Sequence, residues 1–162
     1  MQKTLQPPDI VEAGPPLIFL AGPIQGSDKW REKAIKIIDE LDPKITIASP
    51  ERDFWSTGFV YEKQVDWETH YLREAAKQGV ILFWLGKEAH HDCKRAYAQT
   101  SSFELAEWKV RHERDRVRIA LGIEENFTNS HYIKRRFNQD CPDVPISDSL
   151  EETCEFAVKL LG

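Results

Sequence analysis

The residues with the clearest potential for chemistry lie at positions 100–108, where a run of hydroxyl side chains leads into an expected helix that carries Glu104. We expect this helix to begin at Ser101, which places Glu104 in its first turn, where unpaired backbone N–H groups keep a carboxylate ionised and oriented. Such a carboxylate can attack an anomeric carbon and form a covalent glycosyl ester. The same pair also fits a capping box, in which the glutamate only closes the start of the helix. Both interpretations stay open on these residues alone.

A second candidate is the loop over residues 21–26, which follows a short apolar run and contains two glycines. A glycine directly after a strand lets the backbone approach a ligand closely, so we expect Gly22 to lie against a substrate. The spacing is not that of the GxGxxG dinucleotide motif, and binding of NAD or FAD therefore finds little support. An ordinary turn between a strand and a helix is the alternative interpretation.

Composition limits the class of protein. The chain has 162 residues, 41% apolar and 30% charged, which is typical of one soluble globular domain. Its net charge of -5 argues against a nucleic acid polymer as partner. The apolar runs are too short for a membrane span.

The three cysteines form no CxxC pair and indicate reduced thiols in the cytoplasm. No metal is expected, because the neighbouring acidic, histidine and cysteine residues at 88–93 cannot all converge on one ion.

Short apolar runs alternate with amphipathic segments along the chain, and this alternation predicts the fold. Residues 1–16 are expected to be a loose leader and residues 17–162 a single domain. We expect strands over residues 17–21, 45–48, 80–85, 117–122 and, weakly, 144–146, and helices over residues 28–41, 64–78, 101–114, 129–138 and 147–161. Such an order forces crossovers. The prediction is therefore an α/β, doubly wound parallel sheet of about five strands with helices on both faces.

In sheets of this kind, ligands bind beyond the carboxyl ends of the strands. That rule nominates the four loops that follow the first four expected strands, at residues 21–27, 49–62, 86–102 and 123–129. Glu104 comes just after the third of them. The expected site therefore combines this carboxylate with the loop around Gly22.

Three segments together resemble the nucleoside 2-deoxyribosyltransferase family and its close relatives. They are Phe-Leu-Ala-Gly-Pro-Ile at residues 19–24 with a downstream Trp30, Val-Asp-Trp-Glu at 65–68, and Ser-Ser-Phe-Glu-Leu-Ala-Glu-Trp at 101–108. The resemblance covers residues 17–137 in the family's order. It implies a compact flavodoxin-like fold, a homo-oligomer (a dimer or a trimer of dimers), and cofactor-free transfer of 2-deoxyribose between a nucleoside and a free nucleobase.

The family's nucleophile carries over onto Glu104. A general acid should face it across the sugar, because a nucleobase leaves poorly unless a ring nitrogen is protonated. Asp66 is the first candidate for this acid and Glu68 the second, although Asp66 and His70 could equally pair on a solvated helix face. The expected substrate-binding residues are Phe19, Gly22, Pro23, Ile24, Gln25, Glu68, Ser101 and Asn126, and the last corresponds to a family position that reaches the site of a neighbouring subunit.

The sequence departs from the family where an aspartate usually precedes the nucleophile by six residues, because this position holds Ala98. The preferred base is therefore left open. Two other functions also stay open. One is a nucleoside or nucleoside 5′-monophosphate N-glycosidase, in which water resolves the glycosyl ester. The other is a catalytically silent nucleotide-binding module on the same fold.

Overall fold

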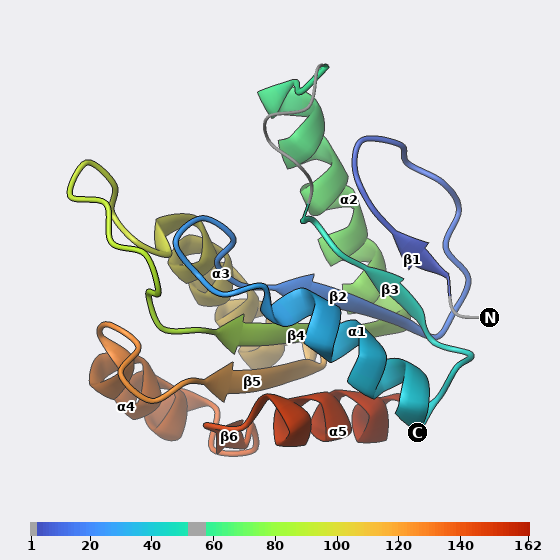
Figure 1. Cartoon of the computed structure of the whole chain (residues 1–162). Coiled ribbons are helices and arrows are strands. Elements are labelled where there is room, and N and C mark those ends of the chain that lie inside the picture. The colour runs from blue at the N-terminus through green and yellow to red at the C-terminus, as the bar shows by residue number, and fades with distance from the viewer. Residues whose placement is uncertain (1–2, 52–57) are drawn as a thin grey trace.

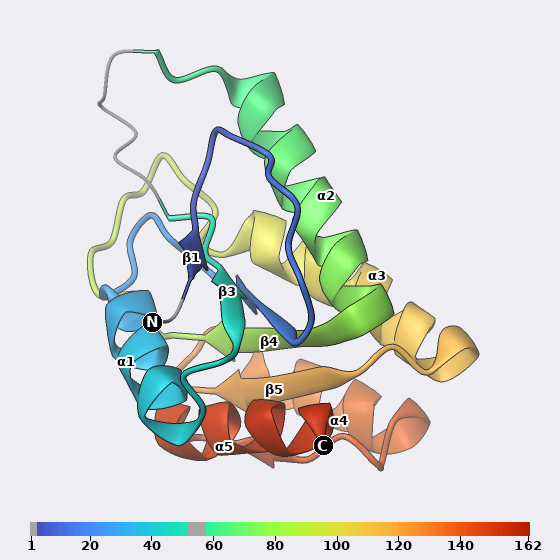
Figure 2. The same ribbon diagram turned by 90° about the vertical axis from the view of Figure 1, so that its right-hand side faces the viewer.

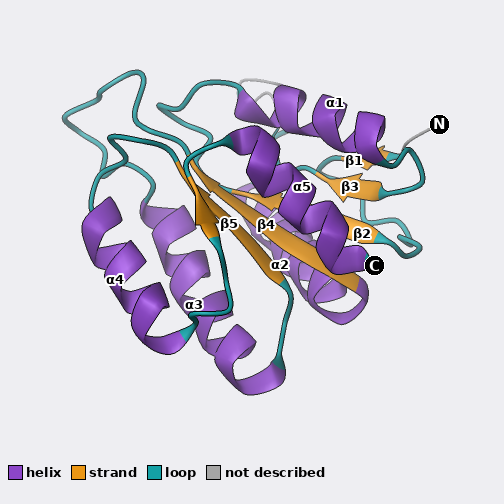
Figure 3. Cartoon of the chain, turned by 90° about the horizontal axis from the view of Figure 1, so that it is seen from below, coloured by secondary structure: helices purple, strands orange, loops and turns teal. Residues whose placement is uncertain are grey.

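The computed structural model describes residues 3–51 and 58–162, and within them the chain forms one parallel sheet between two layers of helices (Figures 1 and 3). The strands lie in the order β1-β3-β2-β4-β5-β6. They are β1 (Thr4–Leu5), β2 (Leu17–Ala21), β3 (Thr46–Ala48), β4 (Gly79–Leu85), β5 (Ile119–Ile123) and β6 (Ile146–Ser147). The helices are α1 (Trp30–Leu41), α2 (Tyr61–Gln78), α3 (Gln99–Asp115), α4 (Ser130–Asp140) and α5 (Leu150–Leu161).

Two separate hydrophobic clusters hold the helices to the sheet, one on each face. Every residue of β2, β4 and β5 is buried, as expected for parallel strands covered on both sides. Along β4, Ile81 and Phe83 belong to the cluster shared with α2 and α3, whereas Val80 and Leu82 belong to the cluster shared with α1 and α5. The predicted doubly wound, flavodoxin-like class is therefore confirmed, with six strands where about five were expected.

The sixth strand comes from the N-terminal segment, which the sequence analysis expected to be loose. Strand β1 pairs with β3 in parallel. The residues after it run along α2 (Figure 2) and are held by side chains of that helix. Trp67 Nε1 donates to the Asp9 carbonyl at 3.2 Å, and the Tyr71 hydroxyl both accepts from Val11 N–H at 2.9 Å and donates to the Val11 carbonyl at 2.8 Å. A two-residue strand has no periodicity, so the sequence pattern contained no signal for it.

The predicted elements are all present, but two helices begin earlier than expected, and both changes affect the site. Helix α2 begins at Tyr61 rather than at residue 64, and α3 begins at Gln99 rather than at Ser101. Among the described helices, none combines the length and the apolarity that crossing a bilayer requires.

The order of the strands determines where a ligand can bind. After β2 the chain crosses to β3 on one side and later returns to β4 on the other side, so the direction of winding reverses at β2. The connection after β2 leads to α1 on one face, and that after β4 leads to α3 on the opposite face (Figure 3). At such a switch point the two loops diverge and leave a crevice at the carboxyl ends of the strands.

Tyr71 offers a test of how firmly the N-terminal segment is held. We expect Tyr71→Phe to fold normally but to lower the free energy of unfolding by about 1–3 kcal/mol, because it leaves the N–H and carbonyl of Val11 without their partner. Urea unfolding followed by circular dichroism measures this difference. Tyr132→Phe is the control, since the Tyr132 hydroxyl is bound only at an exposed site, by Arg136. Equal unfolding midpoints for Tyr71→Phe and the wild type would show that this contact does not hold the segment.

Candidate active site

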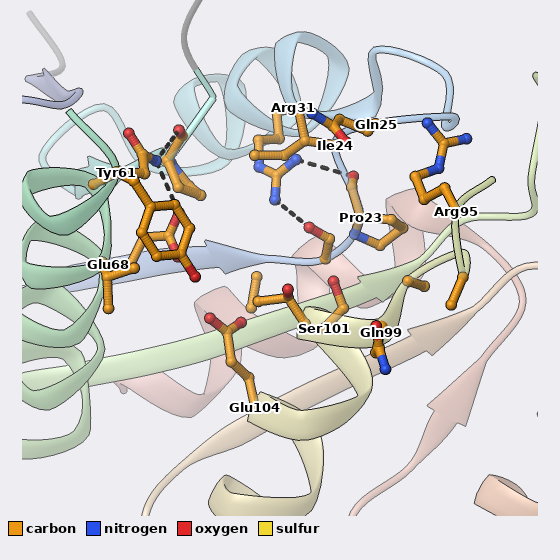
Figure 4. Close-up of a pocket in the computed structure, with 18 of the residues that line it drawn as sticks. Pro23, Ile24, Gln25, Arg31, Tyr61, Glu68, Arg95, Gln99, Ser101 and Glu104 are labelled. Atoms are coloured by element: carbon orange, nitrogen blue, oxygen red, sulfur yellow. Dashed lines mark hydrogen bonds between the residues drawn. The ribbon is translucent and has the colours of Figure 1, made fainter. Parts of the chain in front are cut away.

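A cavity of about 600 Å³ opens at the carboxyl ends of β2, β3 and β4. The loop after β2, the start of α2, and the segment that leads from β4 into α3 form its walls (Figure 4). Three of the four nominated loops therefore contribute, whereas the loop after β5 does not line this cavity. The sequence-predicted residues that it brings together are Phe19, Gly22, Pro23, Ile24, Gln25, Glu68, Ser101 and Glu104.

Arg31 of α1 holds the loop after β2 in place. Its side chain is only 1% exposed and donates to the carbonyls of Leu20 at 3.3 Å, Pro23 at 3.2 Å and Gly22 at 2.7 Å. Burial lowers the pKa of Arg31 to about 10, which leaves the guanidinium charged at neutral pH. Arg31 was not among the residues expected from the sequence to form the site. The sequence could have indicated it through its spacing with Ala34 and Ile38, which places the charged side chain of Arg31 on the buried face of α1.

Gly22 is required by the packing of the protein itself. Its φ of +149° lies in a region that residues with side chains rarely adopt, and a Cβ there would lie 2.2 Å from the Trp84 carbonyl oxygen and 2.8 Å from the Trp30 ring. Gly22 also lines the cavity, so its expected contact with a substrate stays a prediction. A side chain at this position would collide with the protein before it met a ligand.

Glu104 points from α3 into the cavity (Figure 4). Because α3 begins at Gln99, Glu104 lies in the second turn and Ser101 lies inside the helix. The N-cap is Ala98, in a left-handed conformation with φ of 56° and no side-chain cap. The capping-box interpretation of Ser101 and Glu104 is therefore wrong, and so is the expectation that a first-turn position keeps the carboxylate ionised.

Burial has the opposite effect on Glu104. Burial, reinforced by the nearby carboxyl of Glu68, raises the pKa of this carboxyl from 4.5 to about 8, although the Arg31 guanidinium opposes the change. Glu68 reaches the same cavity from α2, where burial also raises its pKa. Gln64 orients it by donating from Nε2 to Glu68 Oε1 at 2.8 Å and to the Pro50 carbonyl at 3.0 Å. Two carboxyl groups that repel each other in a partly dry site favour holding one proton between them.

Asp66, the first candidate for the acid, lies elsewhere. It is exposed and borders a shallow depression on the outer side of α2 together with His70 and Arg73. Successive helical residues are about 100° apart, so Asp66 and Glu68 project in nearly opposite directions. The geometry of the chain therefore supports Glu68 rather than Asp66. Asn126 is exposed in the loop after β5 and does not line the cavity, so its expected contact with a neighbouring subunit stays a prediction.

Several further lining residues were not expected from the sequence, among them Tyr61, Gln64, Arg95 and Gln99. Tyr61 and Gln64 precede Glu68 by seven and four residues and share its helix face, a spacing that the expected start of α2 at residue 64 obscured. Arg95 and Gln99 come from the segment around the start of α3. Arg95 is positioned by hydrogen bonding to the His90 carbonyl at 3.0 Å. Residues in a polar loop have no periodicity, so the sequence pattern did not distinguish them from a solvated surface.

The raised pKa of Glu104 predicts how stability changes with pH. A folded-state pKa of about 8, above the ordinary 4.5, means that the folded protein binds this proton more tightly than the unfolded chain does. The resulting stabilisation is complete at pH values below 4.5 and is lost as the pH rises through 8. Glu104→Gln removes the effect. The free energy of unfolding of Glu104→Gln, relative to that of the wild type, should therefore increase by about 1–3 kcal/mol from roughly pH 5 to pH 9. This energy is smaller than the pKa shift alone would give, because solvent at the open site screens the charge.

Urea unfolding of both proteins across this pH range measures the difference. Glu107→Gln is the matched control, because Glu107 is exposed one turn further along the same helix and pairs with Arg111 at 2.9 Å. A constant difference between Glu104→Gln and the wild type at all pH values would contradict a raised pKa at Glu104.

Comparison with known proteins adds an independent finding. A model of the family described as nucleoside 2-deoxyribosyltransferase like matches residues 15–121 of the chain. A search among curated proteins found no match. The matched segment runs from the start of β2 into β5 and includes every loop that lines the cavity, with Glu68 and Glu104. The match covers more than half of the chain, which therefore belongs to the nucleoside 2-deoxyribosyltransferase-like family.

Proposed function

We propose that this protein transfers 2-deoxyribose between nucleobases, with Glu104 as the nucleophile and Glu68 as the proton donor. The observation that carries the proposal is the pair of carboxyl groups with raised pKa in one cavity, beside the fixed charge of Arg31. A nucleophile and an acid with different proton affinities are what cleavage of an N-glycosidic bond needs. The family match supports the same class of reaction.

In the first step, an oxygen of the Glu104 carboxylate attacks C1′ of the nucleoside as the bond from C1′ to the base nitrogen breaks. The bonding electron pair leaves with the base, and the proton of Glu68 moves to a ring nitrogen of that base. The product is a deoxyribosyl ester of Glu104. The single proton of the pair must therefore be on Glu68 in the productive complex, where the positive charge of Arg31 stabilises the anion left on Glu104.

In the second step, a different free base enters the cavity. Its ring nitrogen attacks C1′, its N–H proton passes to the Glu68 carboxylate, and the ester bond breaks to restore Glu104. Two inversions at C1′ give net retention. Water in place of the base would give hydrolysis, which is the N-glycosidase alternative. Neither step requires a metal or a redox cofactor.

The surface beside the cavity supports a homo-oligomer. Phe103 and Val110 of α3 are 75% and 46% exposed, and their spacing places them on one side of the helix. Large apolar side chains gathered on one helix face are typical of surfaces covered by another protein. We propose that a second copy of this chain covers α3, as the family resemblance leads us to expect.

Replacing the nucleophile tests the proposal directly. Glu104→Gln should lower base exchange by roughly 10³-fold or more, because an amide cannot form the glycosyl ester. The assay incubates a 2′-deoxynucleoside with a different free base and follows the new nucleoside by chromatography. Mass spectrometry of the wild type without an acceptor base should detect the deoxyribosyl adduct, which the variant should lack.

Three outcomes separate the alternatives. Near-native exchange by Glu104→Gln would show that Glu104 is not the nucleophile. Steady release of free sugar by the wild type, without base exchange, would favour the N-glycosidase. Binding of nucleosides without any turnover would favour a silent binding module.

The identity of the acid is tested on two positions of the same helix. Glu68→Gln should lower the rate by roughly 10²–10⁴-fold and remove one limb of the pH–rate profile, because it cannot deliver a proton to the base. An activated substrate such as a nitrophenyl 2-deoxyriboside, which leaves without protonation, should recover most of this loss. Asp66→Asn is the matched comparison and should behave like the wild type. The opposite pattern, with the loss in Asp66→Asn, would return the role of acid to Asp66.

A further inference from the structure

We propose that Gln64 selects the nucleobase, by accepting a hydrogen bond from an exocyclic amino group of the base. This inference rests on the proposed function and narrows its substrate class to nucleosides of aminated bases, such as adenine and cytosine. In Figure 4, Tyr61 and Glu68 lie on one side of Glu104, so a base that receives its proton from Glu68 is directed toward α2. Gln64 belongs to this wall of the cavity.

Two acceptors hold the side-chain amide of Gln64 in one orientation. Its Nε2 donates to the Pro50 carbonyl at 3.0 Å and to Glu68 Oε1 at 2.8 Å. A backbone carbonyl can only accept, so the nitrogen of the amide, rather than its oxygen, must face Pro50. Both N–H donors of the amide are thereby used. The oxygen Oε1 is the polar atom of Gln64 that is left for a ligand.

This oxygen is buried and unpaired. Gln64 is 5% exposed, and its Oε1 has no hydrogen-bond partner in the described part of the chain. Buried polar atoms of native proteins are nearly always paired, and an acceptor that is left unpaired carries a cost of desolvation. Because Gln64 lines the cavity, a donor on a bound molecule can supply the missing bond.

The surroundings of this oxygen favour an amino group over a carbonyl group. The Pro50 carbonyl and the Glu68 carboxyl both bind the amide nitrogen of Gln64, so this part of the wall presents three oxygen acceptors close together. An amino group brings two N–H donors, whereas a carbonyl of the base would bring a further oxygen. Arg31 already donates to three carbonyls of the loop after β2, and Arg95 lies at the other end of the cavity (Figure 4).

Gln64 thereby links recognition of the base to its protonation. Gln64 and Glu68 are four residues apart, so they share one face of α2 and lie about 6 Å apart along its axis. One planar base can contact both side chains. Because Glu68 Oε1 accepts from Gln64, the proton of the neutral carboxyl lies on Oε2, from which it moves to a ring nitrogen in the proposed mechanism.

Replacing the amino group of the ligand tests the inference without turnover. Calorimetry with the Glu104→Gln protein compares 2′-deoxyadenosine with 6-methylpurine 2′-deoxyriboside, and 2′-deoxycytidine with its 4-methyl analogue. A methyl group has the shape of an amino group but donates no hydrogen bond. In the ring class that binds more tightly, the amino compound should bind roughly 10-fold or more tightly than the methyl compound. Adding Gln64→Met, which keeps the length of the side chain but removes the acceptor, should reduce this preference to about 2-fold or less.

Gln78→Met is the matched control. Gln78 lies on the same helix and has the same pattern of bonds, because its Nε2 donates to the Ala13 carbonyl at 2.9 Å and to Glu74 at 3.4 Å, but it does not line the cavity. This variant should keep the preference for the amino compound. The ratio of the two affinities also separates the roles of Gln64. Loss of the contact with Glu68 alone would lower base exchange equally for amino and methyl substrates and would leave the ratio unchanged.

The outcomes distinguish this inference from the proposed function. Equal affinity for the amino and methyl compounds, with base exchange intact in the wild type, would overturn selection by Gln64 and leave the function standing. An unchanged preference in Gln64→Met would overturn it as well. Tighter binding of 2′-deoxyinosine or 2′-deoxyuridine than of its amino counterpart would assign Oε1 to a ring N–H and overturn the aminated base. Binding of none of these nucleosides, without turnover by the wild type, would overturn both proposals. If Gln64→Met does not fold, the comparison of the ligands on the Glu104→Gln protein decides the question.

Discussion

The buried guanidinium of Arg31 is the interaction on which the site depends. Transferring a charge into the interior costs several kcal/mol unless hydrogen bonds compensate for it, and here three carbonyls of the loop after β2 provide them. The loop is thereby fixed in the shape that lines the cavity. The charge that remains acts on Glu68 and Glu104, where it opposes the rise in pKa that burial causes. Without it, both carboxyl groups would stay protonated to a higher pH.

The topology of the sheet explains how three residues far apart in sequence come to share one cavity. Arg31, Glu68 and Glu104 each lie on the helix that follows a strand, and all three helices start at the carboxyl edge of the sheet. The reversal of winding at β2 separates α1 from α3, because the two helices cover opposite faces (Figure 3). The space between their first turns becomes the cavity. The fold thus determines which helices can contribute, and the helix phase determines which of their residues do.

The fold was predictable because burial requires continuous apolar runs in the central strands and an apolar face on each helix. Every residue of β2, β4 and β5 is buried, so these runs are visible in the sequence. The site was predictable only in part. Glu104 was identified from its expected helix position and the family resemblance, but its environment was misjudged, since hydroxyl residues suggested a cap where the helix in fact begins two residues earlier. The sequence-based preference for Asp66 over Glu68 was wrong because it assigned the cavity to the wrong face of α2. Trp67 and Tyr71 mark the buried face of α2, but only the structure shows that the cavity adjoins Gln64 and Glu68.

In the mechanism that we propose, the paired carboxyl groups would let one site serve both halves of an exchange. The departing base would take a proton from Glu68 and the arriving base would return one, so that the pair would hold the same single proton before and after the reaction. A site built for this symmetry needs no separate base to activate the acceptor. The fate of the proposed glycosyl ester would then depend on what reaches C1′ first. Since the cavity opens to solvent, the difference between a transferase and a hydrolase lies in how well a nucleobase, held beside Glu68 and Tyr61, excludes water from the face that it attacks.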